Sequence, residues 1–516
     1  MIQDYFKTKT VFTLGLIFLI AVLLRFLYFP DNIYFGYDQA RDAFQSLGIL
    51  NGEFKIVGPT TSIPGLNHGA LFYYLYAVIY FISQSDPAGL ATFLRIYNAL
   101  GVVLIFFIAQ NLFGSKNPTF GKWVGIISAL LFAFSYEQTQ YALFMTHPAL
   151  AVLSVLTFYL GMSLLFFRKN PYGFVVSLLG LGLSFQFHFL LAYLGIIFVI
   201  SLGIFWRSIP RLNWKVILGG VLAFGVSVST FIVAELKFGF TTVKNLTAIL
   251  TGSQSSGAAI GGINNALLAG KRYVYDNLLA VNGTEPFLLL VLFIAAVYFL
   301  RDKEYRNQII FLLVWFIGGL VSYFINDTSL YFYGVGTSIS LLLLAAFLIM
   351  KIFPKYKYVS AVLIVIILGS NIYMIQKNNP RGPNKEINVQ TGMLLGDQKK
   401  AIDYIYTKAG GDPFAVNAFS MPLNINTTWA YLLEWYGKEK YGYLPVWGGN
   451  NAKGYEGNLE INNSRSTLPY KRFLIMEPIR GVEIAVKDFF INESWFTDII
   501  EERHFGDIIV DFQKPK

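Results

Sequence analysis

Long apolar segments separated by short polar ones follow one another over the first 375 residues of the chain. A helix that crosses a membrane needs about 20 mostly apolar residues. Segments of this kind lie near residues 11–29, 95–113, 123–136, 141–167, 174–190, 191–206, 215–234, 286–300, 308–325, 335–351 and 358–375. The pattern predicts a mainly α polytopic membrane protein with about 11 transmembrane helices.

Two of these segments need separate treatment. Residues 174–206 contain no Asp, Glu, Lys or Arg, and such a run is too long for one ordinary span. We therefore expect a tight hairpin around Gln186 to His188. No small-residue cleavage site follows the segment 11–29, which predicts a retained helix and not a signal peptide.

The pattern changes after residue 375. Residues 376–390 are polar and contain two prolines, which is typical of a linker. The runs DQKKAIDYIYTKAG and WAYLLEWYGKEKYG are typical of helices, and PFAVNAFS, RFLIMEP and IIVDF of strands. We expect two domains. Residues 1–375 form a transmembrane domain with outer loops 30–94 and 235–285, and residues 376–516 form a soluble α/β domain.

The distribution of charge predicts the orientation. Residues 1–375 hold 23 of the 40 basic and 13 of the 30 acidic residues. If the short apolar segment 69–83 does not span, the inner loops hold 15 basic and three acidic residues, and the outer loops seven and ten. The positive-inside rule then favours a cytoplasmic amino terminus in a plasma or inner membrane. The carboxy-terminal domain is extracytoplasmic, and residues 69–83 form a re-entrant or interfacial helix.

Composition excludes several classes of protein. Charged residues make up 14% of the chain, against about 25% in soluble proteins, so an ordinary soluble protein and a disordered chain are both excluded. The absence of cysteine excludes disulfides and cysteine-ligated metals. There is no P-loop or dinucleotide-binding motif. The expected contacts are with membrane lipids, with no nucleic-acid partner.

The first outer loop carries the strongest candidate chemistry, in the run GYDQARDA. Asp38 and Asp42 are four residues apart, so a helix would place them on one face. One interpretation is a solvated helix start, where acidic residues are favourable. The other is a carboxylate that acts as a general base at the membrane surface, with Arg41 binding an anionic group such as phosphate.

This run resembles the first-loop motif of the GT-C glycosyltransferases, especially bacterial family 39, protein O-mannosyltransferase-like and aminoarabinose transferase-like proteins. Gln39 stands where those proteins commonly have Glu, and Asp42 where they have an aromatic residue. Further landmarks follow in a similar order: GPTTSIPGLNHGALFYYLY, RIYNALGVV and SYEQTQYALFMTHP. The resemblance covers most of residues 10–375.

The resemblance implies an inverting glycosyltransferase. Asp38 would be the catalytic base and would deprotonate an acceptor hydroxyl or amine. That group would attack the anomeric carbon of a sugar carried on a polyprenyl phosphate donor. The acceptor is a protein, a lipid-linked glycan or a cell-envelope polymer, and the sugar is a hexose or a pentose.

A phosphate leaving group requires positive charge nearby, and other polar residues could complete the site. The candidates for binding the donor phosphate or sugar are Arg41, Arg95, Lys271, Arg272, His188 and Tyr331, and the possible accessory residues are Asp42, His68, Glu137 and His147.

Each candidate also has a structural interpretation. Arg95 can anchor a helix end at the interface, and Lys271 can contact lipid head groups. Tyr331 can belong to the interfacial aromatic belt. His188 can be a neutral histidine bonded to Gln186 or to a carbonyl.

A divalent metal held by Asp38, Glu137, His68 and His188 is possible because these are suitable ligand types, but no local spacing supports it.

Two other functions remain open at this point. A membrane transporter or flippase is the main alternative, although transporters usually show repeats and polar residues near the bilayer midplane. This chain places its acidic residues near the outer ends of helices. An assembly protein with a decayed catalytic site is the second alternative, because Gln39 replaces the usual Glu.

Overall fold

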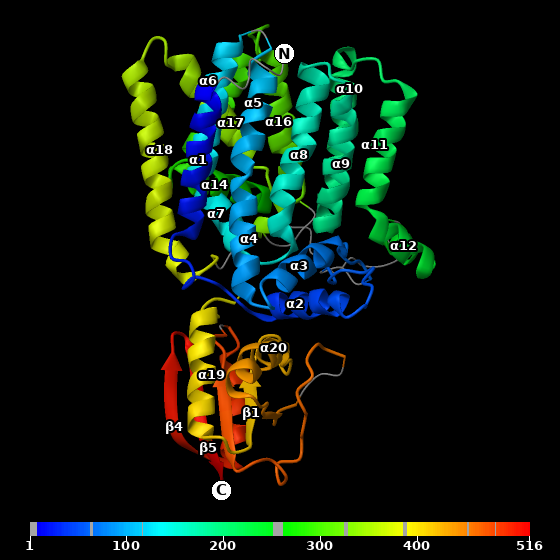
Figure 1. The fold of residues 1–516 in the computed structure, drawn as a ribbon. Coiled ribbons are helices and arrows are strands. Elements are labelled where there is room, and N and C mark those ends of the chain that lie inside the picture. The colour runs from blue at the N-terminus through cyan, green and yellow to red at the C-terminus, as the bar shows by residue number, and fades with distance from the viewer. Residues whose placement is uncertain are drawn as a thin grey trace.

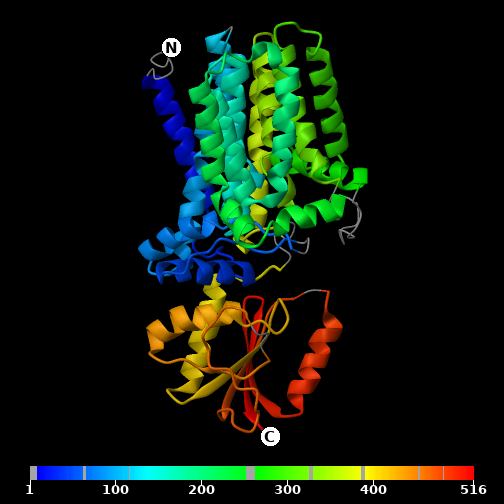
Figure 2. The same cartoon turned by 90° about the vertical axis from the view of Figure 1, so that its right-hand side faces the viewer.

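The computed structural model describes residues 8–61, 65–115, 117–250, 262–324, 329–384, 390–450, 454–479 and 481–516. A bundle of long helices forms one part of the molecule, and a small domain containing a β-sheet forms the other (Figures 1 and 2). The amino-terminal end of the first helix lies at the end of the bundle that is far from the sheet domain.

The bundle is built from apolar helices whose polar residues lie mainly at their ends. Its elements are α1 (Thr8–Phe26), α2 (Tyr37–Leu50), α3 (Leu71–Ile82), α4 (Pro87–Ala99), α5 (Gly101–Phe113), α6 (Pro118–Phe134), α7 (Tyr136–Leu143), α8 (His147–Phe167), α9 (Tyr172–Phe187), α10 (Tyr193–Ile204), α11 (Trp214–Ser227), α12 (Ser229–Lys237), α13 (Thr241–Leu250), α14 (Gly262–Asn277), α15 (Glu285–Phe299), α16 (Arg306–Val321), α17 (Ile339–Ile352) and α18 (Lys357–Asn378).

Each apolar segment expected from the sequence falls on a helix or on a pair of consecutive helices. Among the described residues, four continuous helices are long and apolar enough to cross a membrane: Thr8–Phe26, Pro87–Phe113, His147–Phe167 and Lys357–Arg381. Two bent pairs, α6 with α7 (53°) and α11 with α12 (64°), raise this number to six. The chain is a multi-pass membrane protein, and the count of 11 spans stays a prediction.

The expected hairpin in the uncharged stretch is present. Helix α9 ends at Phe187, His188 has an extended backbone, and a short 3-10 helix (Phe189–Ala192) leads into α10. Small residues let α9 pack closely on α8. A Cβ atom at Gly180 would lie 2.2 Å from the backbone nitrogen of Phe158, and one at Gly161 would lie 2.2 Å from that of Ser177. Close helix approach through small residues is typical of membrane bundles.

Helices α2 and α3 lie across the end of the bundle that faces the sheet domain (Figure 1). They pack against each other, and α3 turns Tyr73, Tyr76 and Tyr80 inward. Helix α3 corresponds to the short apolar segment that the sequence predicts to be re-entrant or interfacial. Its direction, across the bundle axis, is the one expected of an interfacial helix.

The carboxy-terminal domain has a five-stranded sheet of order β2-β1-β3-β5-β4. Strands β1 (Phe414–Phe419), β2 (Val446–Trp447) and β3 (Lys471–Met476) are parallel, while β4 (Thr497–Phe505) and β5 (Ile508–Pro515) form an antiparallel hairpin that joins through β5. Helices α19 (Leu395–Ala409) and α22 (Glu483–Ser494) lie on opposite sides of the sheet (Figure 2), with α20 (Thr427–Leu432) and α21 (Lys438–Tyr441) between β1 and β2 in the chain. The α/β architecture agrees with the sequence pattern.

The sheet domain is hydrogen-bonded to the segment that leads into α2. The backbone N–H of Phe35 donates to Met393 O (2.9 Å), and that of Leu395 donates to Ile33 O (2.8 Å). The hydroxyl of Tyr431, a buried residue of α20, donates to Ser85 O (2.6 Å) at the turn between α3 and α4. The domain therefore holds both ends of the first outer loop.

We expect Tyr431→Phe to loosen this contact. The substitution removes a buried hydrogen bond and leaves the carbonyl of Ser85 unpaired, a cost of about 1–2 kcal/mol. Hydrogen–deuterium exchange of the α3–α4 turn should become several-fold faster. The matched control is Tyr436→Phe, because the Tyr436 hydroxyl bonds Asp403 inside the sheet domain. Equal exchange in both variants would contradict the inferred docking role.

Candidate functional site

Helix α2 begins at Tyr37 because the preceding residues favour a helix start there. Gly36 has an extended backbone, and its N–H donates to the side-chain oxygen of Gln39 at 3.0 Å. This back-bond satisfies a backbone donor that the helix itself cannot pair. Gln39 is buried and acts as a cap, which gives a structural role to the residue that replaces the usual Glu.

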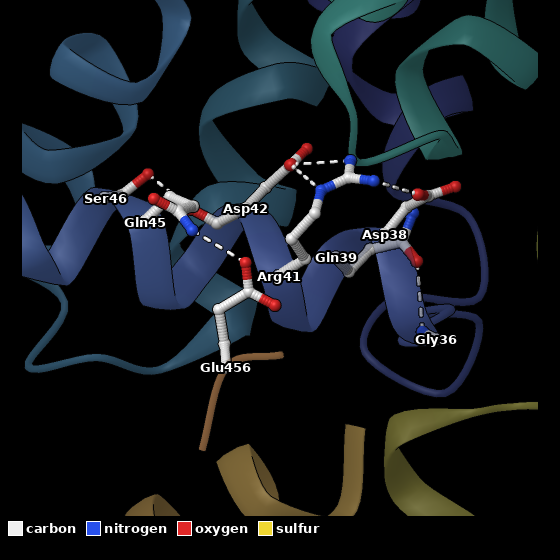
Figure 3. Close-up of polar contacts among 8 residues, drawn as sticks. All are labelled: Gly36, Asp38, Gln39, Arg41, Asp42, Gln45, Ser46 and Glu456. Carbon is white, nitrogen blue, oxygen red and sulfur yellow. Dashed lines mark hydrogen bonds and ion pairs between the residues drawn. The ribbon is translucent and has the colours of Figure 1, made fainter. Parts of the chain in front are cut away.

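One turn of α2 carries a charged trio (Figure 3). The Arg41 guanidinium donates from Nη1 to Asp38 Oδ1 at 2.7 Å, and from Nε and Nη2 to Asp42 Oδ1 at 3.0 and 2.8 Å. The two carboxylates differ in environment: the side chain of Asp38 is 54% exposed and that of Asp42 only 1%. Asp42 therefore binds Arg41 on its buried side, and Asp38 is the accessible carboxylate.

Burial raises the pKa of Asp42 to about 7, against the opposing attraction of Arg41. Its second oxygen, Oδ2, is buried without a hydrogen-bond partner among the described residues. Asp42 also acts electrostatically on Tyr73 and Tyr76 of α3. The buried carboxyl of Asp42 therefore interacts with charged and polar groups of both α2 and α3.

Asp38 and Arg41 line a cavity of about 340 Å³. They are the charged members of its wall within the described residues. The wall also includes Thr60, Thr146, Phe189, Leu330, Phe332 and Tyr333. Of these, Thr60, Thr146, Phe189, Leu330 and Phe332 were not predicted, because nothing in their local sequence distinguishes them from other loop residues.

Three histidines complete the cavity wall. The ring centroids of His68 and His147 are 4.3 Å apart, those of His68 and His188 4.7 Å, and those of His147 and His188 5.8 Å. All three are buried, and one nitrogen from each lies within 4.8 Å of the others. Burial, with His188 and Arg41 nearby, holds the pKa of His68 well below its usual range.

Short backbone contacts position His68. The N–H of His68 donates to Pro59 O (2.8 Å), and the N–H of Gly69 donates to Gln186 O (3.1 Å). A Cβ atom at Gly69 would meet the side chain of Gln186, so only glycine permits this approach. The Gln186 amide donates to Thr230 and not to His188. The suggested Gln186–His188 bond is therefore not formed.

Two candidates lie outside this cavity. The Arg95 guanidinium is fully buried and donates to Arg25 O (3.0 Å), Ala91 O (3.0 Å) and Asn32 Oδ1 (2.9 Å). These bonds fasten α4 to α1 and to the first loop. Glu137 is buried in α7, where Asn277 donates to its Oε2 at 2.6 Å. The structure therefore separates Glu137 from the metal set considered from sequence, and groups His147 with His68 and His188.

The remaining candidates lie on and beside α14. Arg272 stacks over the ring of Tyr331 at 4.3 Å and donates to the Tyr323 hydroxyl at 2.9 Å. The Tyr331 hydroxyl donates to Asp276, and its ring is buried. Its neighbours Phe332 and Tyr333 line the cavity instead. Asp327, which lies four residues before Tyr331 in the sequence, is outside the described residues.

Lys271 lines a second and mostly apolar cavity of about 330 Å³ between α14, α15, α16 and α17. Its wall includes Leu267, Leu289, Phe293, Leu312, Phe316 and Leu344. Lys271 is exposed, and it neighbours Arg272. Helix α14 therefore runs from this apolar groove to the ring stack around Tyr331.

Solved structures show the same fold. ArnT from Cupriavidus metallidurans, bound to undecaprenyl phosphate, matches with a TM-score of 0.60 at 12% identity, over 96% of this chain and 97% of that one. The apo state of the same protein gives a TM-score of 0.58. Archaeal oligosaccharyltransferase AglB from Archaeoglobus fulgidus, in complex with an inhibitory peptide and a dolichol-phosphate, matches at 0.50 and 13% identity, over 80% of this chain and 62% of that one.

These neighbours are GT-C glycosyltransferases. The resemblance predicted from the sequence is confirmed at the level of the fold, and the chain is a membrane protein with the GT-C fold. The sequence matches no family model and no curated protein.

The raised pKa of Asp42 makes stability depend on pH. The folded-state value of about 7 exceeds the ordinary value of 3.8, so the folded protein binds this proton more tightly. The contribution of this proton to the free energy of unfolding is fully present below roughly pH 4 and is lost as the pH rises through about 7. Between these limits, the thermal midpoint of the wild type should fall relative to that of Asp42→Asn. The exposed-acid variant Glu53→Gln serves as control, and parallel profiles for wild type and Asp42→Asn would contradict this assignment.

Proposed function

We propose that the protein is an inverting glycosyltransferase that moves a sugar from a polyprenyl-phosphate donor to an acceptor at the outer face of the membrane. One observation carries the proposal: Asp38 and Arg41 lie side by side in the wall of a cavity at one end of an apolar helix bundle. An accessible carboxylate and a guanidinium are the two groups that this reaction requires, a base and a phosphate ligand.

The chemistry assigns a separate role to each group. Asp38 accepts the proton of the acceptor hydroxyl or amine as that group attacks the anomeric carbon. The bond from this carbon to the phosphate oxygen breaks, and its electron pair leaves with the polyprenyl phosphate. Attack opposite the leaving group inverts the anomeric centre. Arg41 gives three of its five N–H donors to Asp38 and Asp42 and also contacts the Tyr73 hydroxyl. A donor that is not used in these bonds is available to a phosphate oxygen.

The apolar groove beside α14 is suited to the lipid part of such a donor. Its wall is formed almost wholly by aliphatic and aromatic side chains, and Lys271 supplies a cation within it. An isoprenoid chain gains about 25 cal/mol for each Å² of apolar surface removed from water. The ArnT structure is bound to undecaprenyl phosphate and the AglB structure is in complex with a dolichol-phosphate, which supports the same class of donor.

We further propose that the amino terminus is cytoplasmic and that the sheet domain is extracytoplasmic, in a plasma or inner membrane. The two lie at opposite ends of the bundle (Figure 1). The α10–α11 and α17–α18 connections, which carry basic residues, lie at the amino-terminal end. This is the cytoplasmic end under the positive-inside rule. The outer end then holds Asp38, and the acceptor is a glycan, lipid or protein of the cell envelope.

Asp38→Asn is expected to lower the rate of glycosyl transfer by at least about 100-fold, because general-base catalysis commonly contributes this much. The measurement is transfer from a radiolabelled polyprenyl-phosphate sugar by the full-length protein in detergent. Glu53→Gln, which changes an exposed acid of the same loop, should retain full activity. Full activity of Asp38→Asn would exclude this base. Lipids that co-purify with the inactive variant should include the donor. If the protein in vesicles moves this lipid across the membrane but transfers no sugar, it is a flippase.

A matched pair on α14 tests the groove. Leu267 lines it and the adjacent Leu268 does not, although both side chains are about half exposed. Leu267→Trp should fill part of the groove and raise the KM for the lipid donor roughly tenfold, a loss of about 1.4 kcal/mol. The kcat should change little, because the groove is separate from Asp38. Equal KM values for Leu267→Trp and Leu268→Trp would contradict the assignment.

A further inference from the structure

Three of the four histidines in the chain converge on one point. His68 belongs to the loop before α3, His147 begins α8, and His188 occupies the break between α9 and α10. The fourth, His504, is an exposed residue of β4 that contacts Glu502. Because the three come from distant parts of the sequence, their approach is a property of the tertiary structure.

Two of the three side chains have an unsatisfied polar atom. All are less than a tenth exposed. The Nδ1 atoms of His147 and His188 are buried and have no hydrogen-bond partner among the described residues. A buried polar atom without a partner is energetically costly, so two such atoms in one cluster point to a missing ligand. A cation held by the cluster would satisfy them.

We propose that His68, His147 and His188 bind one divalent transition-metal ion, of the zinc class, whose remaining coordination position opens onto the cavity of Asp38 and Arg41. The ligand nitrogens lie within 4.8 Å of one another. Bonds of about 2.0–2.1 Å from zinc to imidazole require a somewhat closer set, so the rings must move inward by about 1 Å. Three imidazoles without a carboxylate favour zinc, cobalt, nickel or copper over magnesium or calcium.

The charge of the cavity suggests a role for this ion in binding the donor phosphate. This role rests on the proposed function. The described wall holds one cation, Arg41, and that guanidinium is already bonded to Asp38 and Asp42. A departing phosphate needs more positive charge than this. Neutral imidazoles leave the double charge of a metal ion uncompensated, so the ion would bind the phosphate of the donor beside Arg41.

The three ligands should not contribute equally. The backbone N–H of Phe189 donates to His68 Nδ1 at 3.1 Å, so binding at His68 competes with an existing hydrogen bond or displaces a proton from its other nitrogen. Within the part of the chain that the structure describes, no such bond holds the Nδ1 atoms of His147 and His188. Loss of His147 or His188 should therefore weaken metal binding more than loss of His68.

The test uses the full-length protein in detergent, stripped with a chelator and then dialysed against zinc or cobalt chloride. Elemental analysis should find about one ion per chain in the wild type, and the cobalt form should show visible absorption bands typical of tetrahedral or five-coordinate sites. His147→Ala and His188→Ala should lose at least about tenfold in affinity, His68→Ala less, and the control His504→Ala nothing. A metal-free wild type without cobalt bands would overturn the proposal, whatever the variants do.

Two further measurements separate this proposal from the proposed function. Asp38→Asn should bind zinc like the wild type, because Asp38 is outside the histidine cluster; altered affinity would overturn the ligand set. His188→Gln keeps a polar side chain at this position and is therefore less disruptive to folding than His188→Ala. It should also lose the metal. If the loaded wild type binds metal but transfers no sugar, the proposed function fails and the metal site stands. If the metal-free protein transfers at the full rate, the assigned contact with phosphate is wrong.

Discussion

The buried pair between Arg41 and Asp42 is the constraint on which the outer end of the molecule depends. A buried carboxylate is costly unless it is paired and hydrogen-bonded, and here Arg41 supplies two bonds to one oxygen. Breaking a pair of this kind by removing one partner typically costs about 3–5 kcal/mol. Because Arg41 is held from one side by Asp42, its remaining edge faces Asp38 and the cavity. The interaction within α2 thus sets the orientation of the proposed reacting groups.

The sheet domain acts on this arrangement from the opposite side. Its first residues pair with the segment before α2, and the Gln45 amide of α2 donates to Glu456 Oε1 at 2.6 Å (Figure 3). Helix α2 is therefore enclosed between the bundle and the domain, which restricts its movement. A site on elements held in this way keeps its geometry better than one on a free loop. We infer that one role of the sheet domain is to support the first outer loop.

The apolar groove and the polar cavity are suited to different parts of an amphiphilic substrate. Helix α14 joins them, because Lys271 lies in the groove and Arg272 stacks on Tyr331, whose neighbours line the cavity. An isoprenoid tail is stable only where water is excluded, whereas a sugar phosphate needs hydrogen-bond donors and charge. The border between bundle and outer loops provides both environments within one protein.

The sequence by itself determined the apolar helices, the break at His188, the α/β pattern of the carboxy-terminal region and the helical placement of Asp38 and Asp42. Each of these depends on local periodicity or on residues close in sequence, as does the resemblance of GYDQARDA to GT-C enzymes. The tertiary structure decided the rest. It buried Asp42 beside Arg41 and left Asp38 accessible, buried Arg95 among hydrogen-bond acceptors, separated Glu137 from the cavity and brought three histidines together. These outcomes depend on burial and on contacts between distant segments, which sequence spacing does not encode.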